Sequence, residues 1–382
     1  MLRGLVIVIM AIDHVRDFFL VGGVQDPTAD PNVTLALFMT RWITHFCAPV
    51  FVLLAGVSAG LMASRRSPGE LSRFVFTRGL WLIAVECVLI STAATFAPRG
   101  IAELGGQVLI TMQVIWAIGA SMIVLSGALL MGRNACLLLG AAIVAGHNLL
   151  DPIWPQGALF DQTQPLWVAL HSQMSITAGP FLFVFLYPLL PWSGVMLFGY
   201  GVSRVFALPD ARRKAALVKS GVAMTAAFVA LRALEIYGDP NPWQWQPRGV
   251  VATAIDFLNT TKYPPSLEFL LMTLGPAALL CAFADRLPAA ISRALLTFGR
   301  VPFAFYVAHI LLIHTLSLLL GVVQGFRASQ LMTIFFFYPA GYGLSLPGVY
   351  AMWALVIAIL YPYCRWMMSL KARRRDWWLS YV

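Results

Sequence analysis

The stretch that decides the fold covers residues 2–19 and reads LRGLVIVIMAIDHVRDFF. It begins as an aliphatic run that is long enough to enter a bilayer as a helix. Within that apolar run it places four ionisable residues almost in a row, Asp13, His14, Arg16 and Asp17. A charged side chain at such depth costs about 2.5–3.5 kcal/mol on insertion scales, so these groups are rare and face a polar interior or a partner. Two interpretations follow: a packing cluster in which Asp13 and Arg16 neutralise each other, or a buried polar site.

The composition places nearly all of the chain in or beside a membrane. Of 382 residues, 60% are hydrophobic and 11% are charged, whereas a soluble domain carries roughly 25% charged residues. The net charge of +10 is gathered in three clusters next to apolar segments, Arg65–Arg78, Arg212–Lys219 and Lys371–Arg375. The positive-inside rule expects such clusters in cytoplasmic loops, so the basic charge does not indicate a nucleic-acid partner.

Apolar segments of about 18–25 residues, the length that crosses ~30 Å of hydrocarbon, recur along the chain. The sequence therefore predicts an all-α polytopic integral membrane protein with about ten transmembrane helices and both termini cytoplasmic. Residues 1–382 form a single transmembrane domain in this prediction. The predicted spans are Leu2–Leu20, Thr40–Ala63, Gly79–Phe96, Gln107–Met131, Ala135–Leu150, Ile176–Val205, Ser220–Tyr237, Pro265–Ala284, Pro302–Leu320 and Gly348–Met368.

Three histidines in separate spans fall at a similar predicted depth, His14, His45 and His309. A single histidine in an apolar helix is more often a hydrogen-bonded packing residue than a catalyst. Three of them, together with Asp13 and Asp17, indicate a polar cavity that opens outward. Histidine near neutral pH can accept a proton from an attacking hydroxyl or amine, and a carboxylate within one turn of it can orient its ring.

Two further motifs supply candidate binding residues. The sequence KYPPSL places Lys262 and Tyr263 at the mouth of the eighth span, where a lysine either snorkels or binds an anionic substrate group. The sequence FGRVP places Arg300 at the cytoplasmic surface below His309, either as a phosphate ligand or as a positive-inside anchor. The histidines and the five cysteines lack metal-type spacing, so no metal site is predicted.

These motifs resemble the bacterial branch of the heparan-α-glucosaminide N-acetyltransferase-like transmembrane acyltransferases. The matching elements are LRG and DHxRDFF within residues 2–19, APxF to AG within residues 48–56, and the two motifs above. The resemblance implies acyl transfer across the membrane, with acetyl-CoA used on the cytoplasmic side and a sugar acetylated on the far side. The lysosomal member has its catalytic histidine in the first outer loop, but Val21–Met39 contains none. His14, His45 and His309 therefore compete for that role.

We predict a membrane acyltransferase that moves an acetyl or short acyl group from cytoplasmic acyl-CoA to an extracytoplasmic sugar or glycan. The alternative is a proton-coupled transporter or solute-binding membrane protein that uses the same Asp/His/Arg cluster. The expected partners are acyl-CoA, a glycan or small-molecule acceptor, and lipids of the bacterial cytoplasmic membrane. The sequence leaves the oligomeric state open, a homodimer included.

The predicted roles follow from depth and neighbours. His14 is the general base, oriented by Asp13 or Asp17, and His45 and His309 line the same cavity. The nucleotide of acyl-CoA binds a basic inner rim of Arg3, Arg78 and Arg300, and a pantetheine arm of roughly 15–20 Å, about half the hydrocarbon thickness, reaches the histidines. The residues predicted to bind the acceptor are Arg16, Trp243, Trp245, Lys262 and Tyr263.

Overall fold

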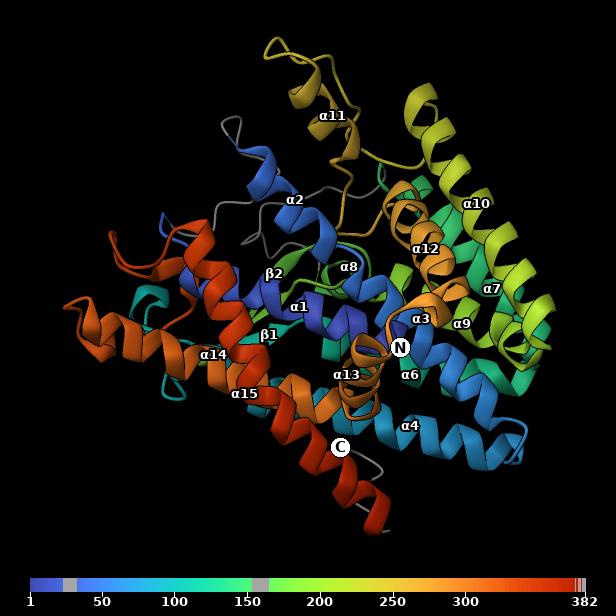
Figure 1. The fold of residues 1–382 in the computed structure, drawn as a ribbon, viewed down its shortest axis with the longest axis horizontal. Coiled ribbons are helices and arrows are strands. Elements are labelled where there is room, and N and C mark those ends of the chain that lie inside the picture. Colours follow the sequence, from blue (N-terminus) through green and yellow to red (C-terminus); the bar gives the residue numbers. More distant parts are fainter. Residues whose placement is uncertain (23–32, 153–164, 375, 377–378, 380–382) are drawn as a thin grey trace. The chain divides into compact units, whose positions relative to one another are not determined.

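A computed structural model describes residues 1–22, 33–152, 165–374, 376 and 379 (Figure 1). Its contacts divide the chain into two compact units. Unit 1 comprises Met1–Cys47, Val88–Ile110 and Leu287–Val382, and unit 2 comprises Ala48–Cys87 and Thr111–Arg286. Parts of the predicted outer loops Val21–Met39 and Asp151–Ser175, and the basic residue Arg375, lie outside the described residues. The single transmembrane domain stays a prediction.

Unit 1 is built around the first helix. α1 (Leu2–Phe19) packs against α2 (Leu35–Thr44), α13 (Ala289–Arg300), α14 (Pro302–Val323) and α15 (Leu346–Arg373), and α5 (Ser91–Thr95) packs against α14. Close approach of α1 and α13 depends on two glycines, because a Cβ on Gly4 would collide with the Leu295 carbonyl and one on Gly299 would press against Gly4. Pro302 stands in the first turn of α14, where its missing N–H costs nothing, so a new helix starts there.

Unit 2 consists mainly of helices that pack in pairs: α4 (Pro68–Val85) on α6 (Val114–Ala128), α7 (Arg133–Gly146) on α9 (Leu189–Val202), and α10 (Asp210–Leu234) on α12 (Leu267–Ala282). The remaining helices of this part of the chain are α3 (Cys47–Met62), α8 (Pro165–Leu170) and α11 (Val250–Leu258). Each pair is in close contact at small residues, as is usual where lipid gives helices no hydrophobic drive to associate. The glycines at these contacts are Gly79 and Gly119, Gly140 and Gly194, and Gly221 and Gly275.

The prediction of an all-α polytopic membrane protein is confirmed. Seven helices among the described residues are long and apolar enough to cross a membrane, and they coincide with the second to fifth, seventh, ninth and tenth predicted spans. The predicted count of ten is not confirmed. The first predicted span forms α1, which carries four charged residues and is not among the seven, and the eighth forms α12, which has only 16 residues.

The sixth predicted span, Ile176–Val205, is wrong as one helix. Its first half pairs as two antiparallel strands, β2 (Met174–Ala178) and β3 (Phe181–Phe185), and α9 follows only after Pro188. β-Branched and aromatic residues favour strands, and Gly179 with a positive φ of 57° supports the turn between them. A third short strand, β1 (Val108–Met112), precedes α6.

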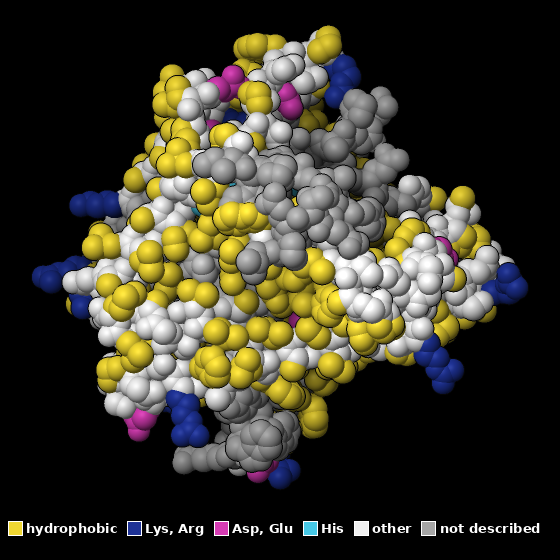
Figure 2. Space-filling model, turned by 180° about the vertical axis from the view of Figure 1, so that it is seen from behind, with side chains coloured by type: hydrophobic (Ala, Val, Ile, Leu, Met, Phe, Trp, Pro, Cys, Tyr) yellow, Lys and Arg dark blue, Asp and Glu magenta, His cyan; other side chains and the backbone are white. Residues whose placement is uncertain are grey.

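The surface agrees with a membrane location. On the face drawn in Figure 2, apolar side chains cover most of the described surface, and the basic side chains lie mainly toward its edges. Large apolar side chains such as Leu138 of α7, Val222 of α10 and Leu280 of α12 are exposed. Contiguous apolar exposure of this kind is unusual for a soluble monomer and expected for a surface that contacts lipid.

Candidate active site

Two histidines from opposite ends of the chain meet inside unit 1. His14 of α1 and His309 of α14 approach with 2.7 Å between Nδ1 of His14 and Nε2 of His309. Nδ1 of His309 lies against the carbonyl oxygens of Tyr306 and, at 3.2 Å, Phe305, and a carbonyl only accepts hydrogen bonds. In the neutral ring that Nδ1 therefore carries the hydrogen, and Nε2 accepts from Nδ1–H of His14. The pattern assigns the unprotonated nitrogen of His14 to Nε2, the atom that a general base needs.

The charged residues beside His14 form a balanced cluster. Arg16 donates to Asp17 and lies 3.1 Å from Asp13, while Nη1 of Arg41 donates to both carboxylate oxygens of Asp13 at 3.0 and 2.8 Å. Two carboxylates thus face two guanidinium groups, which is the arrangement that makes burial of charge tolerable. The predicted contact between Asp13 and Arg16 is present, and Asp13 bridges it to α2.

One hydrogen-bond donor of Arg16, Nη1, has no partner among the described residues. The side chain of Arg16 is 4% exposed. A buried guanidinium nitrogen in this state is a charge-assisted donor available to a ligand oxygen. This geometry is compatible with the predicted role of Arg16 in substrate binding.

Sequence reasoning missed Arg41 and Glu86. Arg41 completes the cluster of α1, and the excess of one carboxylate over guanidinium groups within residues 13–17 was the available indication that another cation was needed. Glu86 is fully buried in unit 2, and its Oε2 accepts a hydrogen bond from the backbone N–H of Trp116, in the first turn of α6. A carboxylate at that position satisfies a helix N-terminus, so the geometry gives Glu86 a structural role.

The other histidines have separate surroundings. His45 is buried where α2 ends, immediately before α3, and its place in the same cavity as His14 stays a prediction. His314 packs on another face of α14, with its ring nitrogens 2.8 Å from the Ala93 carbonyl and 2.9 Å from the Leu331 carbonyl. Its ring also stacks on Phe96 with 4.1 Å between centroids. His314 is therefore a packing residue.

Two of the three predicted inner-rim arginines are brought together. Arg3 precedes Gly4 and Arg300 follows Gly299, and these two glycines mark the close approach of α1 and α13. Arg300 is exposed and contacts Met368 of α15 through Nη1. The third, Arg78, lies on α4 in unit 2.

Trp243 and Trp245, two predicted acceptor-binding residues of unit 2, differ in the exposure of their rings. The indole Nε1 of Trp243 donates to the Arg232 carbonyl at 2.9 Å, and its ring packs against Phe257. Trp245 is 78% exposed. Of the two tryptophans, Trp245 has the ring face that is open to a ligand.

Unit 2 holds a second polar group at its predicted outer end. His147 and His171 are joined by 3.1 Å between Nδ1 and Nε2, and Asp151 lies 3.8 Å from His171. Burial lowers the pKa of His171 and raises the pKa of Asp151, so both are shifted toward their neutral forms. A cavity of about 440 Å³ adjoins them, lined by Asn148, Asp151, Pro152, Tyr237, Gly238, Asp239 and Pro240.

A histidine pair and a balanced ionisable cluster within apolar helices define an integral membrane protein with a polar interior site. A family model described as heparan-alpha-glucosaminide N-acetyltransferase, catalytic, matches residues 1–238, more than half of the chain. The chain belongs to this family of membrane acetyltransferases, which confirms the resemblance at the level of the family. No curated protein matches the chain, and no solved structure does. The matched residues do not include His309, Arg300, Lys262, Trp243 or Trp245.

Proposed function

We propose that the protein transfers an acetyl group from cytoplasmic acetyl-CoA to a sugar or glycan acceptor on the far side of a bacterial cytoplasmic membrane, with His14 as general base. The contact between His14 and His309 carries this proposal, because it leaves Nε2 of His14 as the proton acceptor. In other enzymes a carboxylate often holds such a ring. Here His309 would do so, while Asp13 and Asp17 neutralise the two neighbouring arginines.

The proposed reaction step gives roles to two residues of the chain, His14 and Arg16. The acyl donor supplies an acetyl thioester. Nε2 of His14 accepts the proton of the acceptor's amine or hydroxyl as that group forms its bond to the acetyl carbon. The carbon–sulfur bond breaks, CoA leaves as its thiolate, and the protonated His14 returns the proton to that sulfur, so both the neutral ring and free CoA are formed. The free Nη1 of Arg16 is suited to stabilise oxygen charge that develops in this step.

The spacing along α1 supports the proposed path of the donor. Arg3 and His14 are separated by eleven residues, or about 16 Å at 1.5 Å per residue. A pantetheine arm of roughly 15–20 Å, about half the hydrocarbon thickness, matches that separation. With the nucleotide at Arg3 and Arg300, the thioester would reach the histidine pair.

Purified full-length protein incubated with labelled acetyl-CoA and glucosamine-type acceptors tests the proposal. We expect release of CoA and transfer of label to the acceptor. Solute-coupled proton flux in vesicles without acyl transfer would instead establish the transporter, and binding of CoA from the outer surface would contradict the proposed direction.

Replacing Arg300 by Gln should weaken CoA binding about 10–100-fold, because a hydrogen bond to a charged phosphate contributes about 1.5–3 kcal/mol. Calorimetric titration of CoA into detergent-solubilised protein measures the effect. Arg293→Gln, an exposed position on the same helix, is the matched control. Equal affinities of the two variants would remove Arg300 from the donor site.

Replacing Trp245 by Leu should raise the acceptor KM about 3–10-fold, the loss expected for one aromatic contact of about 0.5–1.5 kcal/mol. The KM for acetyl-CoA should stay unchanged. Trp243→Leu should instead lower thermal stability, because that ring packs on Phe257 and its Nε1–H is bonded to a backbone carbonyl. An unchanged acceptor KM in Trp245→Leu would show that this ring does not bind the acceptor.

A further inference from the structure

Lys262 of unit 2 is a buried lysine without a counter-ion among the residues that the structure describes. The residue is 8% exposed, yet no hydrogen bond or ion pair joins its ammonium to any residue that the structure describes. The ammonium contacts the ring of Tyr263, with 5.0 Å from Nζ to the ring centroid. A cation–π contact offsets only part of the cost of removing an ammonium from water.

Two carboxylates near Lys262 in the sequence, Asp239 and Glu268, bind other groups. Asp239 accepts from the backbone N–H groups of Asn241 and Thr261 and from the hydroxyls of Thr261 and Ser266, at 2.7–2.9 Å. These four bonds fill the roughly four acceptor positions of a carboxylate. Glu268 is paired with the buried Arg232.

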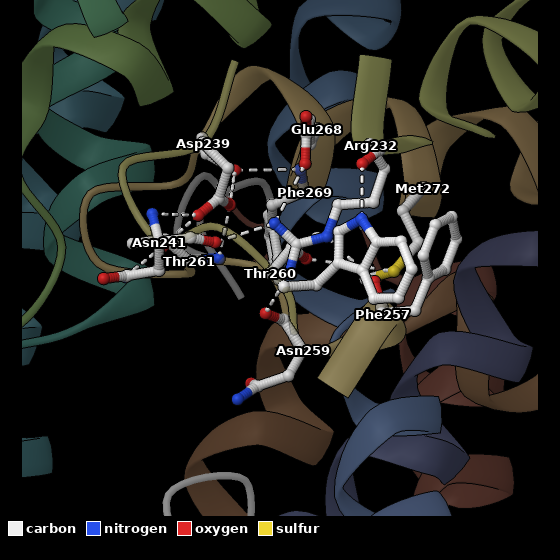
Figure 3. Close-up of polar contacts among 12 residues, drawn as sticks. Arg232, Asp239, Asn241, Phe257, Asn259, Thr260, Thr261, Glu268, Phe269 and Met272 are labelled. Atoms are coloured by element: carbon white, nitrogen blue, oxygen red, sulfur yellow. Dashed lines mark hydrogen bonds and ion pairs between the residues drawn. The ribbon is translucent and has the colours of Figure 1, made fainter. Parts of the chain in front are cut away.

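The segment that carries Lys262 is also held rigidly (Figure 3). Nε, Nη1 and Nη2 of Arg232 donate five hydrogen bonds, to Glu268 and to the carbonyls of Asn241, Asp256, Phe257 and Asn259. A guanidinium has five N–H donors, so all are used. Asp239 fixes the neighbouring Thr261 directly. The backbone next to Lys262 is therefore held in place by hydrogen bonds.

We propose that Lys262 binds an oxyanion of the acceptor, a carboxylate, sulfate or phosphate carried on the sugar. This inference rests on the proposed function for the identity of the ligand as acceptor. An oxyanion supplies both the missing counter-charge and the hydrogen-bond acceptors of the ammonium. The small exposed fraction of the side chain gives such a group access.

Binding of matched sugars to the full-length protein, without acyl-CoA, tests the assignment. The probes are glucose 6-sulfate, glucose 6-phosphate and methyl glucuronide, with neutral methyl glucoside as the reference. Wild-type protein in zwitterionic lipid should bind at least one anionic sugar about 10–100-fold more tightly than the reference, the range of a hydrogen bond to a charged group. Lys262→Met should abolish that preference, and Lys262→Arg should retain part of it.

The variants also distinguish an effect on binding of the anionic sugar from an effect on folding stability. Lys262→Met keeps the length of the side chain and removes a buried charge, so its thermal stability should equal or exceed that of the wild type. Lys219→Met, at an exposed lysine of the same unit, should keep the preference for anionic sugars. A preference that survives Lys262→Met, or no preference in the wild type, overturns the assignment.

Binding of anionic lipid and the acetyl-transfer assay together identify the source of the oxyanion. Lys262-dependent binding of anionic lipid alone, with no sugar bound, would assign the group to a lipid headgroup and overturn the acceptor assignment. Because binding is measured without a donor, failure of acetyl transfer contradicts the proposed function and leaves the anion site intact. Absence of the anion preference in the wild type, with acetyl transfer present, contradicts only the anion site.

Discussion

His14→Ala should fold, bind acetyl-CoA with normal affinity, and turn over at least about 100-fold more slowly, since a general base contributes 10²–10⁴-fold in rate. The loss should appear in kcat, because Nε2 of His14 acts on the reacting proton and is not assigned to binding of either substrate. Steady-state acetyl transfer with purified protein, together with calorimetric titration of CoA, measures both quantities.

His314→Ala is the matched control for this prediction. Its ring is also buried in unit 1 and bonded to carbonyl oxygens, so its loss should lower thermal stability and leave kcat of the folded fraction within a few-fold of normal. Near-normal turnover of His14→Ala would remove His14 from the mechanism and leave His309, then His45, as candidates.

Arg41→Met should destabilise the protein by about 1–3 kcal/mol, because it leaves the largely buried carboxylate of Asp13, 16% exposed, without one of its two cations. Reversible denaturation in detergent measures the change in the free energy of unfolding. Arg213→Met breaks an exposed ion pair with Asp210 and should cost no more than about 1 kcal/mol.

The double variant Arg41→Met with Asp13→Asn distinguishes charge balance from packing. It leaves Arg16 and Asp17 as one neutral pair, so it should be more stable than Arg41→Met alone. If the two changes destabilise additively, the contact between Arg41 and Asp13 contributes little, and the cluster is not held together by charge.

The membrane helices could be predicted because their apolar composition is a local property. The α1 boundary agrees with its predicted span to within one residue, and Pro302 marks the start of α14. The apolar run after Ser175 could not be resolved, because a short apolar run is compatible with a strand and with a buried helix. Its hairpin depends on pairing between strands.

His14 and His309 could be singled out from the sequence as polar residues at a similar depth, but their pairing could not. Spacing within one turn favoured Asp13 or Asp17 as the partner of His14, whereas the structure pairs it with His309, 295 residues further on. Similarly, the two carboxylates and one guanidinium group of residues 13–17 indicated that another cation was needed, but nothing in the sequence singled out Arg41. Contacts between distant helices are tertiary and leave no local trace.

The composition of unit 1 has a consequence for how the protein is made. α1 is synthesised before all of its neighbours, with four charges in an apolar stretch, and three of the four helices that pack on it come from residues beyond 287. Arg41 follows within 28 residues of Asp13 and allows early neutralisation. His309 follows His14 by 295 residues, so the contact between the two histidines can form only after α14 has been synthesised. The histidine pair that we propose as the reaction centre therefore assembles later than the charge cluster beside it.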